Sequence, residues 1–182
     1  MSPPIGISPP GAARAPGFEQ PFEMLHACHE RVERMLTLLH KLRSHVRSMG
    51  PDEQVRQAAR DVMRYFDIAA PQHHRDEELH VFPTLIGLLD EDVTRLVAQL
   101  QLDHGIMEAR WRAVRSLLEE IENGTRTTFN EADDAVFDAF AAIYRKHIES
   151  EEAVAFPRAS ATMERERLEA MSQDMMARRG VK

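Results

Sequence analysis

Apolar residues recur at spacings of three and four along most of the chain, which is the pattern of helices that bury one face. Four stretches with this pattern begin near Phe22, Asp52, Asp90 and Glu131. No stretch alternates polar and apolar residues over a useful length, so we predict no β-sheet. Four helices of about 20–33 residues joined by short loops favour antiparallel neighbours. The pattern therefore predicts an all-α fold, an up-down-up-down antiparallel four-helix bundle.

Local signals place the breaks in these helices. Pro71 falls inside the second stretch, so we expect a kink where the carbonyl of Asp67 loses its hydrogen-bond partner. The third helix should end at Asn123, which a glycine follows. Thr128 and Glu131 resemble a capping box that opens the fourth helix.

Composition and pattern together divide the chain into three regions. Residues 1–17 are rich in proline, glycine and alanine and should form a disordered arm. Residues 18–161 should form the four-helix bundle. Residues 162–182 should form a short final helix, over about 164–178, and a tail.

The composition excludes several classes of protein. With 182 residues, the chain is long enough for one domain with its own core. No apolar run reaches the length of a membrane span, and the first residues lack the apolar stretch of a secretory signal. The net charge of −7 argues against a nucleic-acid surface, and a single cysteine, Cys28, fits a reducing cytoplasm. We therefore expect a cytoplasmic protein that binds neither membranes nor nucleic acid.

A doubled motif is the most specific feature of the chain. The pattern His-x-x-x-Glu-Glu-x-x-x-Phe-Pro begins at His73 and again at His147. In each copy the histidine and the first glutamate are four residues apart, so they lie on the same helix face, one turn from each other. The pairs are His73 with Glu77 and His147 with Glu151.

The first and third helices each add a histidine near the middle of the apolar face, His29 and His104. Mid-helix positions of an antiparallel bundle lie at about the same height, so the four imidazoles should converge in the core. A lone core histidine usually finds a hydrogen-bond partner, but this cluster with two carboxylates would be costly without a cation. Imidazole and carboxylate ligands together suit iron best, with manganese or zinc as alternatives. Because two facing carboxylates can each span a pair of ions, the sequence predicts a two-metal site.

This set of residues, spread over about residues 22–160, resembles the hemerythrin family, often called HHE cation-binding domains. The resemblance rests on the doubled motif and on one histidine from each of the first and third helices. It implies two iron ions, held by terminal histidines and bridged by two glutamates together with an oxo or hydroxo group. The implied ligands are His29, His73, His104 and His147 as terminal ligands, and Glu77 and Glu151 as bridges.

The chain departs from the oxygen carriers of that family at the fifth histidine. In those proteins the third helix supplies two histidines four residues apart, whereas here the position four after His104 is Glu108. His74 is the first candidate for the missing terminal ligand. It faces about 100° away from His73 on an ideal helix, but a kink could rotate it inward. Glu108 and then Glu33 are the next candidates.

The resemblance implies a protein that binds or senses a diatomic ligand, O2 or NO. Four histidines would leave two coordination positions open on two octahedral irons, and two open positions favour redox turnover. Two alternatives therefore stay open. One is a di-iron redox enzyme acting on peroxide, NO, ferrous iron or damaged iron–sulfur centres, and the other is an iron-responsive regulatory module. Glu78 and Glu152, the second glutamates of the motif, either orient ligand imidazoles or lie on a solvated face.

Overall fold

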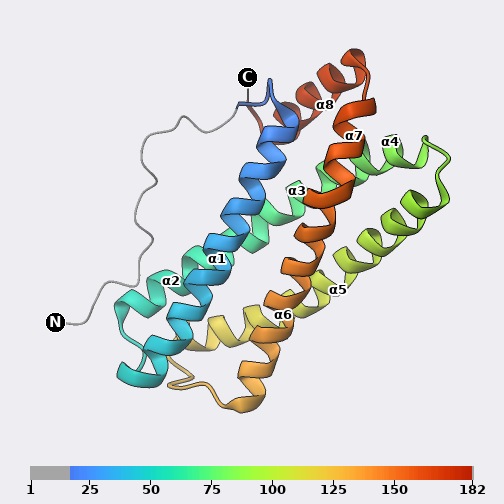
Figure 1. Ribbon diagram of the computed structural model, residues 1–182. Coiled ribbons are helices and arrows are strands. Elements are labelled where there is room, and N and C mark those ends of the chain that lie inside the picture. Colours follow the sequence, from blue (N-terminus) through green and yellow to red (C-terminus); the bar gives the residue numbers. More distant parts are fainter. Residues whose placement is uncertain (1–16, 182) are drawn as a thin grey trace.

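The computed structural model describes residues 17–181, and every regular element within them is a helix (Figure 1). Four long helical segments, here called bundle helices 1 to 4, run alternately up and down, which confirms the predicted bundle. Except for residue 17, the arm expected over residues 1–17 lies outside the described residues.

Two of the bundle helices are continuous and two are interrupted by π-helical turns. Bundle helix 1 is α1 (Pro21–Met49), and bundle helix 3 is α5 (Glu91–Glu122). Bundle helix 2 joins α2 (Glu53–Arg64), η1 (Tyr65–Ala69), α3 (Ala70–Asp76), η2 (Glu77–Val81) and α4 (Phe82–Ile86). Bundle helix 4 joins α6 (Glu131–Ser150), η3 (Glu151–Ala155) and α7 (Phe156–Thr162), and the short helix α8 (Arg165–Arg178) follows it.

Each π turn precedes a proline. The residue before Pro71 donates its N–H to the carbonyl of Tyr65, five residues back rather than four. The residues before Pro83 and Pro157 make the same bond, to the carbonyls of Glu77 and Glu151 respectively. Because proline has no N–H and its ring crowds the preceding turn, the helix widens locally and continues. The break expected near Pro71 therefore takes the form of a π turn.

The bundle has two apolar clusters instead of one continuous core. The large cluster includes Val32, Leu36, Phe66, Trp111, Phe140 and Tyr144. The small cluster includes Leu25, Phe82, Leu100, Phe156, Met171 and Met175. On every bundle helix, the histidines and glutamates predicted to bind metal fall between the residues of one cluster and those of the other. The polar site is therefore a layer between two apolar blocks.

The helix α8 is held against bundle helix 2 by ion pairs. Arg178 and Arg179 both bind the fully buried carboxylate of Asp76, the latter with Nη2 2.6 Å from Oδ2. Nε2 of His80 lies 2.7 Å from Oδ2 of Asp174 in α8. Two methionines of α8 complete the small apolar cluster, which fixes the C-terminal helix over one end of the bundle.

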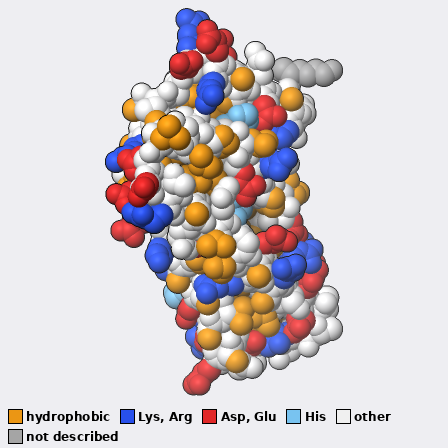
Figure 2. All heavy atoms as spheres, turned by 90° about the vertical axis from the view of Figure 1, so that its right-hand side faces the viewer, with side chains coloured by type: hydrophobic (Ala, Val, Ile, Leu, Met, Phe, Trp, Pro, Cys, Tyr) orange, Lys and Arg blue, Asp and Glu red, His pale blue; other side chains and the backbone are white. Residues whose placement is uncertain are grey.

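The surface carries charges of both signs. Figure 2, which shows the side of the molecule on the right in Figure 1, has acidic and basic side chains interspersed with hydrophobic ones. None of the described helices has enough length and hydrophobicity to cross a membrane.

The cap of bundle helix 4 differs from the prediction. Asn130, not Thr128, accepts the hydrogen bond from the backbone N–H of Asp133, and the Asp133 side chain accepts one from the Asn130 N–H. Phe129 is buried against Phe137, with ring centroids 5.0 Å apart, and this contact fixes where the chain enters the helix. The capping box predicted at Thr128 and Glu131 is therefore wrong by two residues.

Replacing the observed cap should weaken the fold. We expect Asn130→Ala to lower the free energy of unfolding by about 1 kcal/mol, because an N–H at the helix start loses its acceptor. Thr128→Ala should change it by less than about 0.5 kcal/mol. Urea unfolding followed by circular dichroism measures both variants, and equal losses would contradict the assigned cap.

Candidate metal centre

Six side chains from all four bundle helices meet between the two apolar clusters. All six are buried, and both carboxyl groups have no exposed surface. The six residues are His29 of α1, His73 of α3, Glu77 of η2, His104 of α5, His147 of α6 and Glu151 of η3. The structure thus brings together every terminal and bridging residue predicted from the doubled motif and the two single histidines.

The first half of this site contains His29 and His73 together with both glutamates. Nε2 of His73 lies 3.0 Å from Oε1 of Glu77. Nε2 of His29 lies 3.2 Å from Oε2 of Glu151 and 3.9 Å from Oε1 of Glu77. The four donor atoms of this half lie within 4.8 Å of one another, a spacing that one metal ion can fill.

The second half contains His104 and His147 with the same two glutamates. Nε2 of His104 lies 3.3 Å from Oε2 of Glu77, and Nε2 of His147 lies 3.1 Å from Oε1 of Glu151. The two imidazole nitrogens are 3.2 Å apart. Each glutamate therefore turns one oxygen toward each pair of histidines, which is the arrangement of a carboxylate that spans two ions.

The oxygens at the centre have no hydrogen-bond partners among the described residues. Neither oxygen of Glu77 nor either oxygen of Glu151 accepts a hydrogen bond, and Nε2 of His29 makes none. These atoms face imidazole nitrogens at short distances, but the directions are not those of hydrogen bonds. Because an unpaired buried carboxylate is unfavourable by several kcal/mol, the donor set fits a cation that accepts these lone pairs.

The two carboxyl groups differ in acidity without a cation. Burial alone would raise the pKa of Glu77, but the imidazoles of His73 and His104 outweigh it and hold the pKa well below its ordinary value. Burial and the charge of Glu77 raise the pKa of Glu151 to about 8. Two adjacent carboxylates in a dry core resist carrying two negative charges at once, and a metal pair removes that conflict.

The second glutamate and the phenylalanine of the second motif copy both act on a histidine of another helix. Nδ1 of His29 lies 2.6 Å from Oε1 of Glu152. The ring of Phe156 stacks on the His29 ring, with centroids 5.1 Å apart and planes 7° apart. Because the Glu152 carboxylate contacts Nδ1, the other ring nitrogen of His29, Nε2, faces the centre. The phenyl ring fixes the plane of the imidazole.

The first motif copy repeats this arrangement on bundle helix 3. Nδ1 of His104 lies 2.8 Å from Oε1 of Glu78, and the ring of Phe82 lies over His104 with centroids 5.6 Å apart. Of the two alternatives for the second glutamates, the structure favours contact with the imidazoles over a purely solvated position. Every named residue of the motif therefore has a structural task at the centre.

Sequence reasoning missed Asp103. This buried carboxylate lies 3.5 Å from Nδ1 of His147 and accepts a hydrogen bond from Gln99, at 2.8 Å. Cys28 takes the equivalent place beside His73. Asp103 and Cys28 each precede the histidine of their own helix directly, and this shared position in the repeat is the signal that could have found them.

His74, the first candidate for a fifth ligand, lies beside the cluster and outside both halves of it. Its ring stacks on that of His104, with centroids 4.1 Å apart and planes 10° apart. A metal bound by an imidazole lies in the plane of that ring. Because the His74 ring is parallel to the His104 ring but lies in a separate plane, a metal bound by His104 would not lie in the plane of His74. In this orientation, the nitrogens of His74 and His104 do not converge on one ion.

The structure places the two acidic candidates on the surface. The side chain of Glu108 is 74% exposed and lies 3.9 Å from Arg112. That of Glu33 is 46% exposed and lies 4.0 Å from Arg145. The buried position on that turn of α5 belongs to Met107, which is part of the large apolar cluster. Neither glutamate is brought into the centre.

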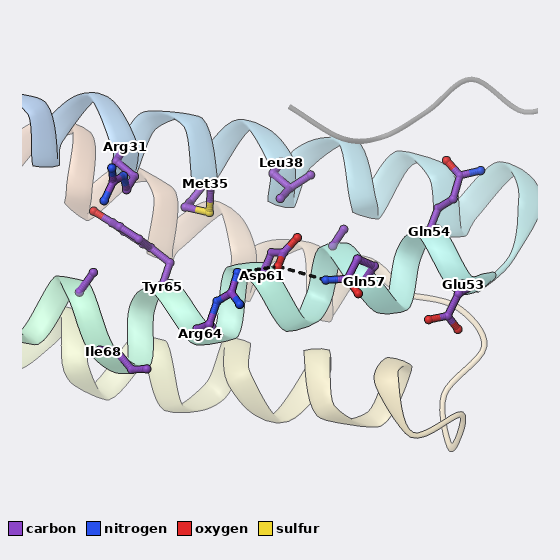
Figure 3. A pocket seen from close by; sticks show the side chains of 12 residues that line it. Arg31, Met35, Leu38, Glu53, Gln54, Gln57, Asp61, Arg64, Tyr65 and Ile68 are labelled. Carbon is purple, nitrogen blue, oxygen red and sulfur yellow. Dashed lines mark hydrogen bonds and ion pairs between the residues drawn. The ribbon is translucent and has the colours of Figure 1, made fainter. Parts of the chain in front are cut away.

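A large cavity elsewhere in the molecule does not contact this site. It has a volume of about 970 Å³ and lies between α1 and bundle helix 2 (Figure 3). Its walls include Arg31, Met35, Tyr65 and Ile68, and none of the six clustered residues lines it. It is therefore not a route to the centre.

Removing a carboxylate behind an imidazole should weaken metal binding without removing a ligand. We expect Glu152→Ala to lower the affinity for Mn²⁺ or Fe²⁺ by about 10- to 100-fold, because His29 loses its orienting partner. Glu149→Ala, at an exposed position two residues after His147, serves as the charge-matched control and should leave the affinity unchanged. Isothermal titration calorimetry measures both, and equal affinities for the two variants would contradict the orienting role.

Comparison with known proteins agrees with this geometry. The family model of the hemerythrin HHE cation-binding domain matches residues 20–159, which include all six clustered residues. A relative from Haemophilus influenzae (strain ATCC 51907 / DSM 11121 / KW20 / Rd), described as an uncharacterized protein, is 32% identical over 165 residues, or 91% of this chain and 93% of the relative. The match confirms the resemblance found in the sequence. The chain belongs to the family of hemerythrin HHE cation-binding domains.

Proposed function

We propose that the protein holds two iron ions in the bundle core and uses them to bind or sense a diatomic ligand, O2 or NO. The sharing of Glu77 and Glu151 between both pairs of histidines carries this proposal. Four imidazole nitrogens and four carboxylate oxygens face the centre, which is more than one six-coordinate ion accepts. Two ions would take four of these atoms each.

The chemistry of the donors supports iron. Mixed imidazole and carboxylate ligands suit iron, with manganese or zinc as alternatives, whereas a site for calcium or magnesium would be built from oxygens. His29 and His73 would hold one ion, His104 and His147 the other. When bound, the pair supplies open coordination positions and electrons for a small molecule. Four protein atoms per ion leave such positions on six-coordinate iron.

The surrounding residues support a ligand-binding role by controlling the site's shape and water content. Glu78 and Glu152 hold two of the imidazoles through Nδ1, so that Nε2 faces the centre. Phe82 and Phe156 pack on the same two rings and form an apolar wall on one side of the polar layer. An apolar wall admits O2 and NO, which are small and uncharged, more readily than water or ions.

Metal analysis and spectroscopy test the proposal together. We expect about two irons per chain in protein purified with iron, and a new charge-transfer absorption when the reduced protein meets air or NO. His73→Ala and Glu151→Ala should each lose at least about half of the iron, because each removes a donor from the buried set. His40→Ala changes an exposed histidine on α1 and should keep both irons.

Two results would contradict this proposal. One iron or none in folded wild-type protein would exclude the shared two-metal centre. An unchanged absorption spectrum after exposure to both gases, in protein that holds two irons, would exclude ligand binding.

A second candidate function is an iron-responsive regulatory module, and the position of Asp76 favours it. Asp76 lies between His73 and Glu77 in the sequence and holds α8 through Arg178 and Arg179. A shift of bundle helix 2 on metal loss would therefore change the docking of α8.

Limited proteolysis tests this second candidate. If α8 docks only on the metal-loaded bundle, we expect cleavage within residues 165–178 to become at least about tenfold faster after iron removal, because the opened fraction rises. Arg178→Ala should make cleavage fast with or without iron. Equal cleavage rates for the iron-loaded and iron-free wild-type protein would contradict the candidate.

A further inference from the structure

The two motif copies differ at the residue that follows the first histidine. That residue is His74 in the first copy and Ile148 in the second. Ile148 packs against the large apolar cluster, whereas the ring of His74 stacks on His104 at 4.1 Å and lies 6.3 Å from the ring of His147. The half of the centre formed by His104 and His147 therefore has an additional imidazole beside it.

A cavity of about 520 Å³ leads to this half of the centre. It lies between bundle helix 2 and α5, and its walls include His74, Glu78, His104, Trp111 and Tyr144. Among the six clustered residues, His104 is the one that lines it in the described part of the chain. A water molecule occupies about 30 Å³ in the liquid, so the cavity admits small molecules without rearrangement.

The ring of His74 is held in one orientation and can donate a hydrogen bond to a molecule in this cavity. Its ring is fixed by stacking on His104 and by the nearby ring of Tyr144, 6.1 Å away. Unlike His29 and His104, which face carboxylates through Nδ1, His74 makes no hydrogen bond within residues 17–181. A neutral imidazole always carries one N–H donor. That donor is therefore available to a molecule in the cavity.

We propose that His74 is a positioning residue that donates a hydrogen bond to a small anion or diatomic molecule held in this cavity at the His104/His147 position. The proposal rests on the two-iron function above and adds the side from which the ligand enters and the residue that it meets. It also gives His74 a role other than that of a fifth ligand, in agreement with the parallel rings of His74 and His104.

Azide titration of the oxidised, iron-loaded protein tests the proposal, with absorbance and the azide infrared stretch as readouts. His74→Leu keeps the bulk of the side chain and removes the donor, so the Kd for azide should rise about 10- to 100-fold. His74→Gln restores an N–H donor and should recover the Kd to within about threefold. Ile148→Leu introduces the same residue at the equivalent place and should leave the Kd and the infrared stretch unchanged.

The outcomes separate this proposal from the function on which it rests. Iron content is measured first, and wild-type protein without two irons would refute the two-iron function itself. With two irons present, an unchanged or lower azide Kd in His74→Leu overturns the hydrogen bond. Loss of iron from His74→Leu also overturns the proposal, because it would make His74 a ligand. An equal effect in Ile148→Leu would also overturn the proposal, because the change in Kd would then not depend on the N–H donor of His74.

Discussion

The structure depends on the burial of two carboxyl groups that the protein itself does not satisfy. Glu77 and Glu151 have no exposed surface, and none of their oxygens accepts a hydrogen bond from a described residue. A bundle of this size could fill the same volume with apolar side chains at lower cost. The polar layer therefore fits a site for a cation. The contact of four imidazoles with these oxygens sets all four bundle helices at a common height.

The doubled motif shapes its own helix and also makes contacts with a second helix. The proline that ends each copy produces a π turn, and in both copies this turn begins at the glutamate shared between the two halves of the centre. The second glutamate and the phenylalanine reach across to a histidine of another helix. Each copy thus supplies candidate ligands from its own helix and supports a candidate ligand on a different one. Each copy therefore supports a histidine in the half of the centre to which the other copy contributes its own histidine.

Much of this arrangement follows from the sequence. Helical periodicity predicts the four bundle helices, and the position of one histidine in the middle of each predicts the common level. Three features did not follow, for separate physical reasons. The cap at Asn130 depends on the burial of Phe129, which is a tertiary contact. The contact of Asp103 with His147 joins two helices, and the position of Asp103 directly before His104 does not say which imidazole it meets. The ring orientation of His74 depends on stacking across helices, which spacing along one helix cannot give.

The separation of the core into two apolar clusters has a consequence for cooperativity. Each cluster contains side chains from all the bundle helices, but the layer between them holds charged and polar groups. Without metal, this layer would couple the two blocks only weakly, and each block could then open as a unit of its own. Metal bound by side chains of all four helices would tie the helices together across the layer, and the two blocks would then unfold together. The centre would then link two small cores into a single domain that unfolds cooperatively.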